Sequence, residues 1–185
     1  MDYKAESDEW LMQQVKTGRR DCLEALVRRY ATPLLTYLHR ISGARHTAED
    51  LLQETFLAVW ARRETFAATG TFASWLFAIA TNCHRQSLRS RSRRLVMFDT
   101  SDSIPAVPCT TPTPLDQSLI IEQQRALELA ISRLPEQQRE VLVMRHWNRM
   151  PHAEIAKVVD CTVATVRSHL HHALKNIRRY MESHS

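Results

Sequence analysis

The polar side chains best placed for chemistry in this sequence suit binding and not covalent catalysis. No glycine-rich phosphate loop, nucleophile–base pair or set of metal ligands occurs at a recognisable spacing. His169, His171 and His172 have no cysteine or carboxylate beside them at ligand spacing, so we expect them to face solvent or DNA. The sequence therefore predicts no cofactor and no metal, and a nucleic-acid enzyme is the weakest of the functions that we consider.

The stretch 47–62, TAEDLLQETFLAVWAR, predicts a helix with one acidic face. Thr47 and Asp50 have the spacing of a capping box, which marks the start of a helix. Apolar side chains recur every three or four residues at Ala48, Leu52, Phe56, Val59 and Trp60. The other face carries Asp50, Gln53, Glu54 and Leu57. By itself this face indicates solvated surface, and the motifs that follow it in the chain favour a binding surface.

The stretch 71–94 predicts a helix, starting at Thr71 or Ser74, that mixes aromatic and basic side chains. Its expected buried stripe is Phe72, Trp75, Leu76, Ile79, Ala80, Cys83, Ser87 and Leu88. Side chains expected away from that stripe are Phe77, Thr81, Asn82, Arg85, Gln86 and Arg89. Single-stranded DNA requires cations for its phosphates and aromatic faces for its unstacked bases. We expect the edges of Phe72 and Trp75 to remain available to bases.

The stretch 154–179 has the spacing of a helix-turn-helix, with the small Ala156 facing Val166 ten residues later. Thr162 can cap the second helix. Its expected inward stripe is Val166, Leu170, Ala173, Leu174, Ile177 and Met181. Its outward stripe is Arg167, Ser168, His171, His172, Lys175 and Arg179. An outward stripe of hydrogen-bond donors favours DNA reading, and a hairpin of an ordinary helical bundle is the alternative.

Further helices must position these motifs, and the composition favours an all-α fold. Glycine is rare, at 3 of 185 residues, and no stretch alternates like a strand. Residues 8–41 predict two helices, capped by Asp8 and Asp21 and closed at 17–18 and 42–43. Pro33 is expected to kink or end the second of them. Residues 119–134 and 135–147 predict two more helices, with a proline at the first position of the second.

The charge distribution indicates two basic domains separated by a linker. The formal charge is +5 and the pI is about 9.3, which favours a polyanionic partner. Basic residues exceed acidic ones in 1–96 and in 118–185, whereas 97–117 holds four prolines, three aspartates and no base. We predict one domain at 1–96, a linker at 97–117 and a second domain at 118–185.

The cysteine pattern predicts a reduced, cytoplasmic protein. The four cysteines, at 22, 83, 109 and 161, are widely spaced and form no CxxC pair. The sequence shows no signal peptide and no apolar run near eighteen residues, so we expect no membrane segment of its own.

Taken in order, the motifs resemble a bacterial RNA polymerase sigma factor of the extracytoplasmic-function (ECF) group. The resemblance rests on RHTAEDLLQETF at 45–56, TFASWLFAIATN at 71–82 and the basic run 89–94, followed by the proline-rich stretch. It continues with LPEQQREVLVMRHW at 134–147 and EIAKVVDCTVATVRSHLHHAL at 154–174. Single motifs are moderately specific, but their order covers nearly the whole chain, from about residue 21 to residue 179.

The resemblance implies a promoter-specificity subunit that binds core RNA polymerase, recognises and helps melt promoter DNA, and initiates transcription without catalysis of its own. Its implied polymerase contacts are Asp50, Gln53, Glu54 and Leu57. Its implied minus-ten contacts are Phe72, Trp75, Asn82, Arg85 and Arg89, with Asn82 holding a base turned out of the stack. Its implied minus-thirty-five contacts are Thr165, Arg167, Ser168, His171, His172 and Lys175. An anti-sigma factor and a role in stress response are also implied.

The sequence departs from the family pattern in the C-terminal motif. Asp160 occupies a turn position at which the family commonly has glycine; aspartate tolerates a left-handed backbone, so we expect the turn to survive. Histidines at 169, 171 and 172 stand where arginine and an aromatic residue are common. A stand-alone helix-turn-helix repressor or activator is the competing function, but it leaves Asn82 and the acidic helix without a role.

Overall fold

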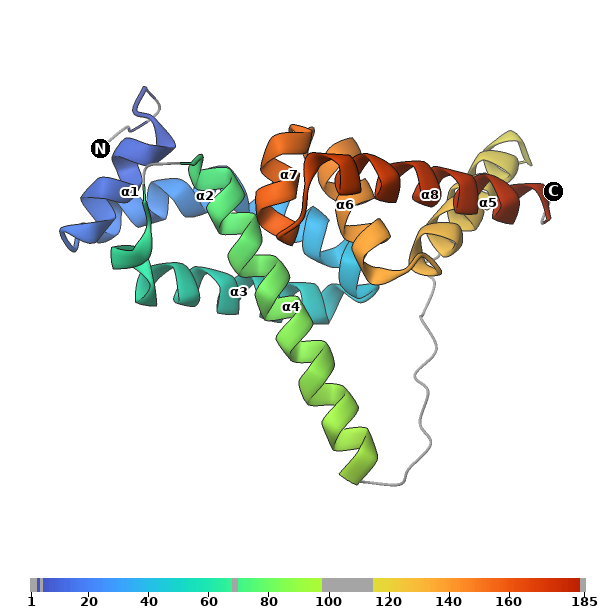
Figure 1. Ribbon diagram of the computed structural model, residues 1–185, viewed down its shortest axis with the longest axis horizontal. Coiled ribbons are helices and arrows are strands. Elements are labelled where there is room, and N and C mark those ends of the chain that lie inside the picture. Colours follow the sequence, from blue (N-terminus) through green and yellow to red (C-terminus); the bar gives the residue numbers. More distant parts are fainter. Residues whose placement is uncertain (1–2, 4, 68–69, 98–114, 184–185) are drawn as a thin grey trace.

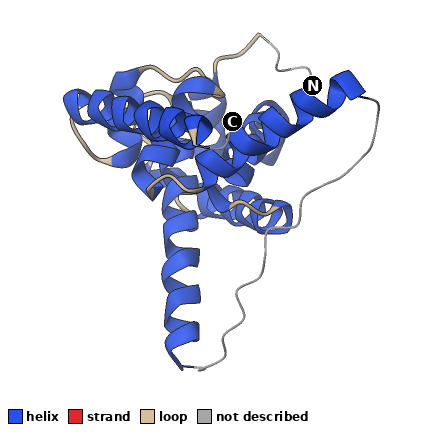
Figure 2. Cartoon of the chain, turned by 90° about the vertical axis from the view of Figure 1, so that its right-hand side faces the viewer, coloured by secondary structure: helices blue, strands red, loops and turns tan. Residues whose placement is uncertain are grey.

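The computed structural model describes residues 3, 5–67, 70–97 and 115–183, and over these residues it contains helices and no strand (Figure 1, Figure 2). The all-α prediction is confirmed. The elements are α1 (Asp8–Lys16), α2 (Arg20–Ser42), α3 (Arg45–Ala61), the 3-10 helix η1 (Arg63–Thr65), α4 (Phe72–Met97), α5 (Leu115–Ser132), α6 (Glu136–His146), α7 (His152–Val159) and α8 (Val163–Glu182).

Most of the expected linker lies outside the described residues, which stop at Met97 and resume at Leu115. The two ends of the expected linker are helical, since α4 extends to Met97 and α5 already begins at Leu115. The predicted domain boundaries stay predictions. Within the described chain, no helix is both long enough and apolar enough to span a membrane.

Helix ends were predicted better than helix starts. Gly18 and Gly43 adopt positive φ values of 91° and 75° just after α1 and α2, a conformation that glycine reaches without the Cβ penalty. The expected caps Asp8, Asp21 and Thr47 are wrong. Ser7 accepts a hydrogen bond from the Trp10 amide instead, and α2 and α3 begin at Arg20 and Arg45 without a side-chain cap. Pro33 lies inside α2 and does not end it.

Helices α1 to α4 form the N-terminal unit, in which α3 packs on α2 and α4, and α1 packs on α2 and α4. Tyr37 at its centre is fully buried, and its hydroxyl shares a hydrogen bond of 2.7 Å with Thr81. The Tyr37 ring meets the Phe77 ring edge to face at 5.1 Å. Phe77 and Thr81 are therefore core residues, and their expected position away from the buried stripe of α4 is wrong.

Helices α7 and α8 form the predicted helix-turn-helix. Asp160 adopts the left-handed conformation at φ 54°, as expected for the turn. The Thr162 hydroxyl accepts a hydrogen bond of 3.1 Å from the Thr165 amide, which confirms the predicted cap of α8. Ala156 and Val166 are both buried in the same cluster, so the small residue allows close approach of the two helices.

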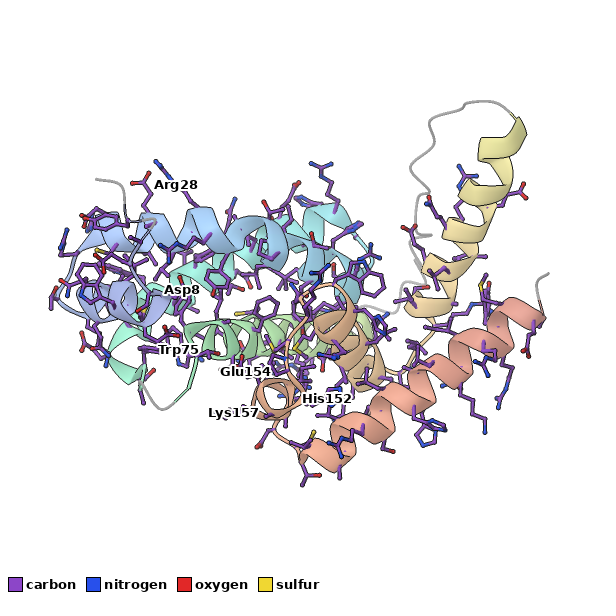
Figure 3. The ribbon with its side chains drawn as sticks, turned by 90° about the horizontal axis from the view of Figure 1, so that it is seen from above. Asp8, Arg28, Trp75, His152, Glu154 and Lys157 are labelled. Atoms are coloured by element: carbon purple, nitrogen blue, oxygen red, sulfur yellow. The ribbon has the colours of Figure 1, made fainter. Side chains whose placement is uncertain are left out.

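The C-terminal helices pack on the N-terminal unit, with α7 on α4 and α6 on α2 (Figure 1). Glu154 of α7 points toward the start of α4, where its carboxylate accepts a hydrogen bond of 2.8 Å from the Thr71 hydroxyl (Figure 3). The Asn148 side chain donates to the Pro33 carbonyl at 3.1 Å, and Arg40 lies 4.1 Å above the Trp147 ring. One apolar cluster runs through both units. Helix α4 is thus buried on two faces, which explains why a single-stripe reading of its sequence failed.

Candidate functional site

The predicted acidic face of α3 is exposed. Asp50, Gln53 and Glu54 are open to solvent, and Leu57, which follows them on the same face, is 71% exposed. The opposite side of α3 buries Ala48, Leu51, Thr55 and Val59. The surface therefore combines one unburied apolar group with carboxylates and an amide. This is the chemistry of a protein-binding face, because an exposed leucine gains from burial and carboxylates select a basic partner.

The second predicted surface lies along α4, whose C-terminal half projects away from the other helices (Figure 1). Asn82 and Arg89 are exposed, as are Arg91 and Arg93 on the projecting part. Within the described chain, no carboxylate forms an ion pair with these three arginines. The projecting half of α4 is therefore a basic arm that suits the phosphates of a nucleic acid.

The aromatic part of that surface is less accessible than predicted. Phe72 is fully buried and contacts the rings of Tyr30 and Phe66 at 5.3 and 6.2 Å. Trp75 is half-buried and meets the Phe66 ring at 5.3 Å. The expectation that Phe72 leaves an edge open for bases is wrong in this arrangement, because neighbouring aromatic side chains cover its ring.

Arg85, also predicted to face DNA, forms an ion pair with Glu140 of α6. Its Nη2 and Nε atoms donate to the two carboxylate oxygens at 2.7 and 3.2 Å. The Glu140 side chain is fully buried, whereas 23% of the Arg85 side chain is exposed. Burial raises the pKa of Glu140, and the Arg85 charge acts in the opposite direction. The Arg85 guanidinium is thus already paired with a carboxylate of the C-terminal unit.

The third predicted surface is the outward face of α8. Arg167, Ser168, His171, His172 and Lys175 are all exposed, and the two adjacent histidine rings lie 5.6 Å apart. Thr165 is half-buried, and its hydroxyl lies 2.9 Å from that of Thr162. The face presents donors from a rigid, capped helix, which is the arrangement needed for reading base edges in a major groove.

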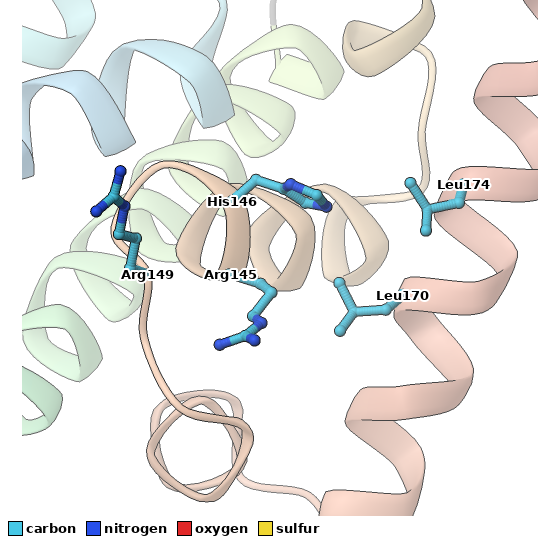
Figure 4. Close-up of a pocket in the computed structure, with 5 residues that line it drawn as sticks. All are labelled: Arg145, His146, Arg149, Leu170 and Leu174. Atoms are coloured by element: carbon cyan, nitrogen blue, oxygen red, sulfur yellow. The ribbon is translucent and has the colours of Figure 1, made fainter.

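Leu174 was expected to point inward, but half of its side chain is exposed. It lines a hollow of about 460 Å³ between α6 and α8 together with Arg145, His146, Arg149 and Leu170 (Figure 4). Two leucines, two arginines and one histidine therefore border the same concave surface, beside the donor face of α8.

One cluster has no counterpart in the sequence reading. His84 of α4 and the α6 residues Glu136 and Glu140 have side-chain ligand atoms within 4.8 Å of one another. His84 is separated from Glu136 by more than fifty positions in the sequence, so local spacing does not predict that the two side chains meet. A sequence signal for a buried His84 is that it lies four residues beyond Ala80, which belongs to the expected buried stripe.

Comparisons with known proteins match both halves of the chain. Residues 26–94 match the family model "Sigma-70 region 2", and residues 124–177 match "Sigma-70, region 4". The first match contains the acidic face of α3 and most of α4, and the second contains the helix-turn-helix.

Whole-chain relatives carry the same family name. The chain is 32% identical to the ECF RNA polymerase sigma factor SigE of Mycolicibacterium smegmatis, covering 88% of this chain and 62% of that protein. It is 30% identical to the ECF RNA polymerase sigma factor SigG of Mycobacterium tuberculosis, covering 86% of this chain and 49% of that protein. The chain thus spans less than two thirds of the length of these two relatives.

A solved structure shows the same fold. The sigma factor RpoE from Bartonella quintana, in complex with the anti-sigma factor NepR, superposes with a TM-score of 0.71 at 21% identity, covering 86% of this chain and 96% of that one. The ordered pair of region models, the relatives and the fold agree with the motifs read from the sequence. The chain belongs to the extracytoplasmic-function group of the sigma-70 family.

Proposed function

We propose that this chain is a promoter-specificity subunit that binds core RNA polymerase, recognises and helps melt promoter DNA, and so initiates transcription. The observation that carries the proposal is the presence of both sigma-70 regions on one chain with three separate exposed surfaces of suitable chemistry. The surfaces are the acidic face of α3, the basic arm of α4 and the donor face of α8.

The acidic face of α3 is the proposed contact with polymerase. Glu54 and Asp50 would pair with basic groups of the partner, and Leu57 would lose its exposed surface on docking. Gln53 adds an amide that can both donate and accept. All four side chains lie on the side of α3 opposite its own core, so binding there requires no unfolding.

The α4 arm and the α8 face are the proposed DNA contacts. Asn82 has an exposed amide suited to the edge of an unpaired base, and Arg89 supplies charge for phosphate about two turns later. On α8, Arg167 and Ser168 would reach the upstream duplex first, and His171, His172 and Lys175 would follow. The subunit would supply binding energy and no catalytic group, and it would act where DNA and polymerase are, in the cytoplasm.

Promoter melting requires that the C-terminal unit moves away from α4. Arg85 is held by Glu140, and α7 covers the start of α4 through the hydrogen bond between Glu154 and Thr71. These contacts occupy the side chains and the surface that the minus-ten element would need. The described arrangement therefore suits a protein not yet engaged with a promoter.

An anti-sigma factor is a further proposed partner. The RpoE structure of similar fold is a complex with such a factor. A partner that holds the two units together would keep Arg85 bound to Glu140 and the α4 surface covered. Release of that partner in response to stress would then free the subunit for polymerase.

Co-purification with core RNA polymerase tests the proposal against a stand-alone helix-turn-helix regulator. The full chain should bind purified core enzyme at a one-to-one ratio, and Glu54→Lys should weaken that binding. Glu24→Lys is the control, because Glu24 is also exposed but lies on α2. A chain that binds a specific duplex without binding core polymerase would instead be a repressor or activator.

A further inference from the structure

A buried histidine and two glutamates meet where side chains of α4 in the N-terminal unit reach α6 of the C-terminal unit. His84 is 1% exposed, Glu140 is fully buried, and Glu136 keeps 38% of its side chain exposed. The ligand atoms of the three residues lie within 4.8 Å of one another. One imidazole and two carboxylates thus converge from two helices at the edge of the protein interior.

Two of the three side chains in this cluster have buried polar atoms without a hydrogen-bond partner among the described residues. These atoms are both ring nitrogens of His84 and the Oε1 atom of Glu136. The His84 Nδ1 atom lies 3.8 Å from that oxygen, which is too far for a hydrogen bond. An unpaired buried polar group destabilises the folded state, so native proteins leave few of them. The unpaired His84 Nδ1 and Glu136 Oε1 atoms thus lie close to each other, as two ligands of a shared cation would.

We propose that His84, Glu136 and Glu140 bind one divalent transition-metal ion, with water completing its coordination. Imidazole nitrogen selects Zn²⁺, Ni²⁺ or Co²⁺ over Mg²⁺ and Ca²⁺, which prefer oxygen ligands alone. Bonds of about 2.0–2.2 Å place tetrahedral ligand atoms about 3.4 Å apart, so ligand atoms that now lie within 4.8 Å of one another must approach by up to about 1.4 Å. Rotation of the partly exposed Glu136 side chain would bring its carboxylate closer to the other two ligands without moving the helices.

Two arginines border the site and act in different ways. Arg85 donates to both oxygens of Glu140, each of which keeps a second lone pair for a metal, so Arg85 would fix the orientation of that ligand. Burial lowers the pKa of His84 to about 4, with the charges of Arg139 and Arg85 adding to the effect. The ring is therefore neutral at pH 7, with a lone pair to donate. The positive charge of Arg139 opposes an incoming cation and should limit the affinity.

The ion would connect two parts of the chain that must separate for promoter melting. One ligand comes from region 2 and two come from region 4 of the family models. Metal binding should therefore stabilise the described arrangement and reduce promoter opening. This consequence rests on the proposed function, whereas metal binding itself does not.

The experiment is a titration of the metal-stripped full chain with Co²⁺, followed by visible absorption, with Zn²⁺ as the displacing ion. We expect one Co²⁺ per chain, displaced by one Zn²⁺, and a higher melting temperature with metal. His84→Gln and Glu136→Gln should each lower the affinity more than about 10-fold, a loss that even an outer-shell partner can cause. Arg139→Gln should lower the dissociation constant, because it removes the opposing charge.

The double variant His171→Ala/His172→Ala is the matched control, since these exposed histidines are the alternative place for adventitious binding. It should bind Co²⁺ as the wild type does. Circular dichroism establishes whether each variant is folded. If His84→Gln does not fold, the Co²⁺ affinity of Glu136→Gln tests the proposal. No Co²⁺ binding by the wild type, or binding that survives both ligand variants or disappears in the control, would overturn the proposal.

Discussion

Removal of the Arg85–Glu140 ion pair should loosen the contact between the two units of the chain. Arg85 provides two hydrogen bonds, of 2.7 and 3.2 Å, to a carboxylate that is fully buried. Arg85→Ala removes both donors and leaves the Glu140 carboxylate in surroundings that already raise its pKa by burial. The charge must then remain unpaired, take up a proton or reach water, and separation of α6 from α4 gives it water.

The magnitude follows from the burial of each partner. Removing one partner of a buried ion pair costs about 3–5 kcal/mol, and Arg85→Ala should fall at or below that range because the units can separate. Glu140→Gln should cost less, about 1–3 kcal/mol, since Arg85 keeps 23% of its side chain exposed and can turn toward solvent. Arg85→Ala/Glu140→Leu should recover most of the loss, because neither charge is then left buried.

Urea unfolding of the full chain, together with its radius of gyration in small-angle scattering, measures the effect. Arg85→Ala should lower the unfolding midpoint more than Glu140→Gln does and should enlarge the molecule. Arg28→Ala is the control, because its ion pair with Glu24 lies on the exposed surface of α2 and should contribute little. If all variants match the wild type in midpoint and size, the pair does not hold the units together.

Three further predictions concern the proposed binding surfaces. Glu54→Lys should leave folding intact and weaken core-polymerase binding by about 2–5 kcal/mol, the loss typical of a broken interface ion pair; an unchanged affinity in a pull-down titration would remove α3 from the interface. Asn82→Ala should slow promoter opening, measured by permanganate reactivity of promoter thymines, and a premelted bubble should restore much of the rate; no rescue would assign Asn82 another role. His172→Arg should tighten binding to the upstream promoter duplex and steepen the salt dependence by about one unit of slope if the new charge meets a phosphate. An unchanged slope and affinity would show that His172 points away from DNA.

Local chemistry made parts of the fold predictable. Gly18 and Gly43 end helices because glycine, which has no Cβ atom, adopts positive φ values without a steric penalty. Thr162 caps α8 through its hydroxyl group. Asp160 forms the helix-turn-helix turn in the left-handed region, as its side chain allows. The exposed faces of α3 and α8 followed from helical spacing, since each helix has a single buried side over most of its length.

Contacts between distant segments were not predictable. Helical spacing predicts a single buried stripe on α4. The helix is instead buried from two directions, by α2 and by α7, and Phe77 and Thr81 therefore lie in the core. The partners Arg85 and Glu140 are 55 positions apart, and neither position carries a local signal of the other. The expected start of α3 at Thr47 is wrong because the helix begins two residues earlier, at Arg45. Thr47 therefore lies inside the helix and cannot be its N-cap.

Transcription from a random-promoter library by purified core polymerase, with and without the full chain, tests the central claim most directly. The chain should direct initiation at templates enriched in two sequence blocks, one near minus ten and one near minus thirty-five. Asn82→Ala should reduce initiation without changing the upstream block, and substitutions at Arg167 should alter that block. Transcripts that do not depend on the chain, or a chain that selects duplexes but never supports initiation, would contradict the account.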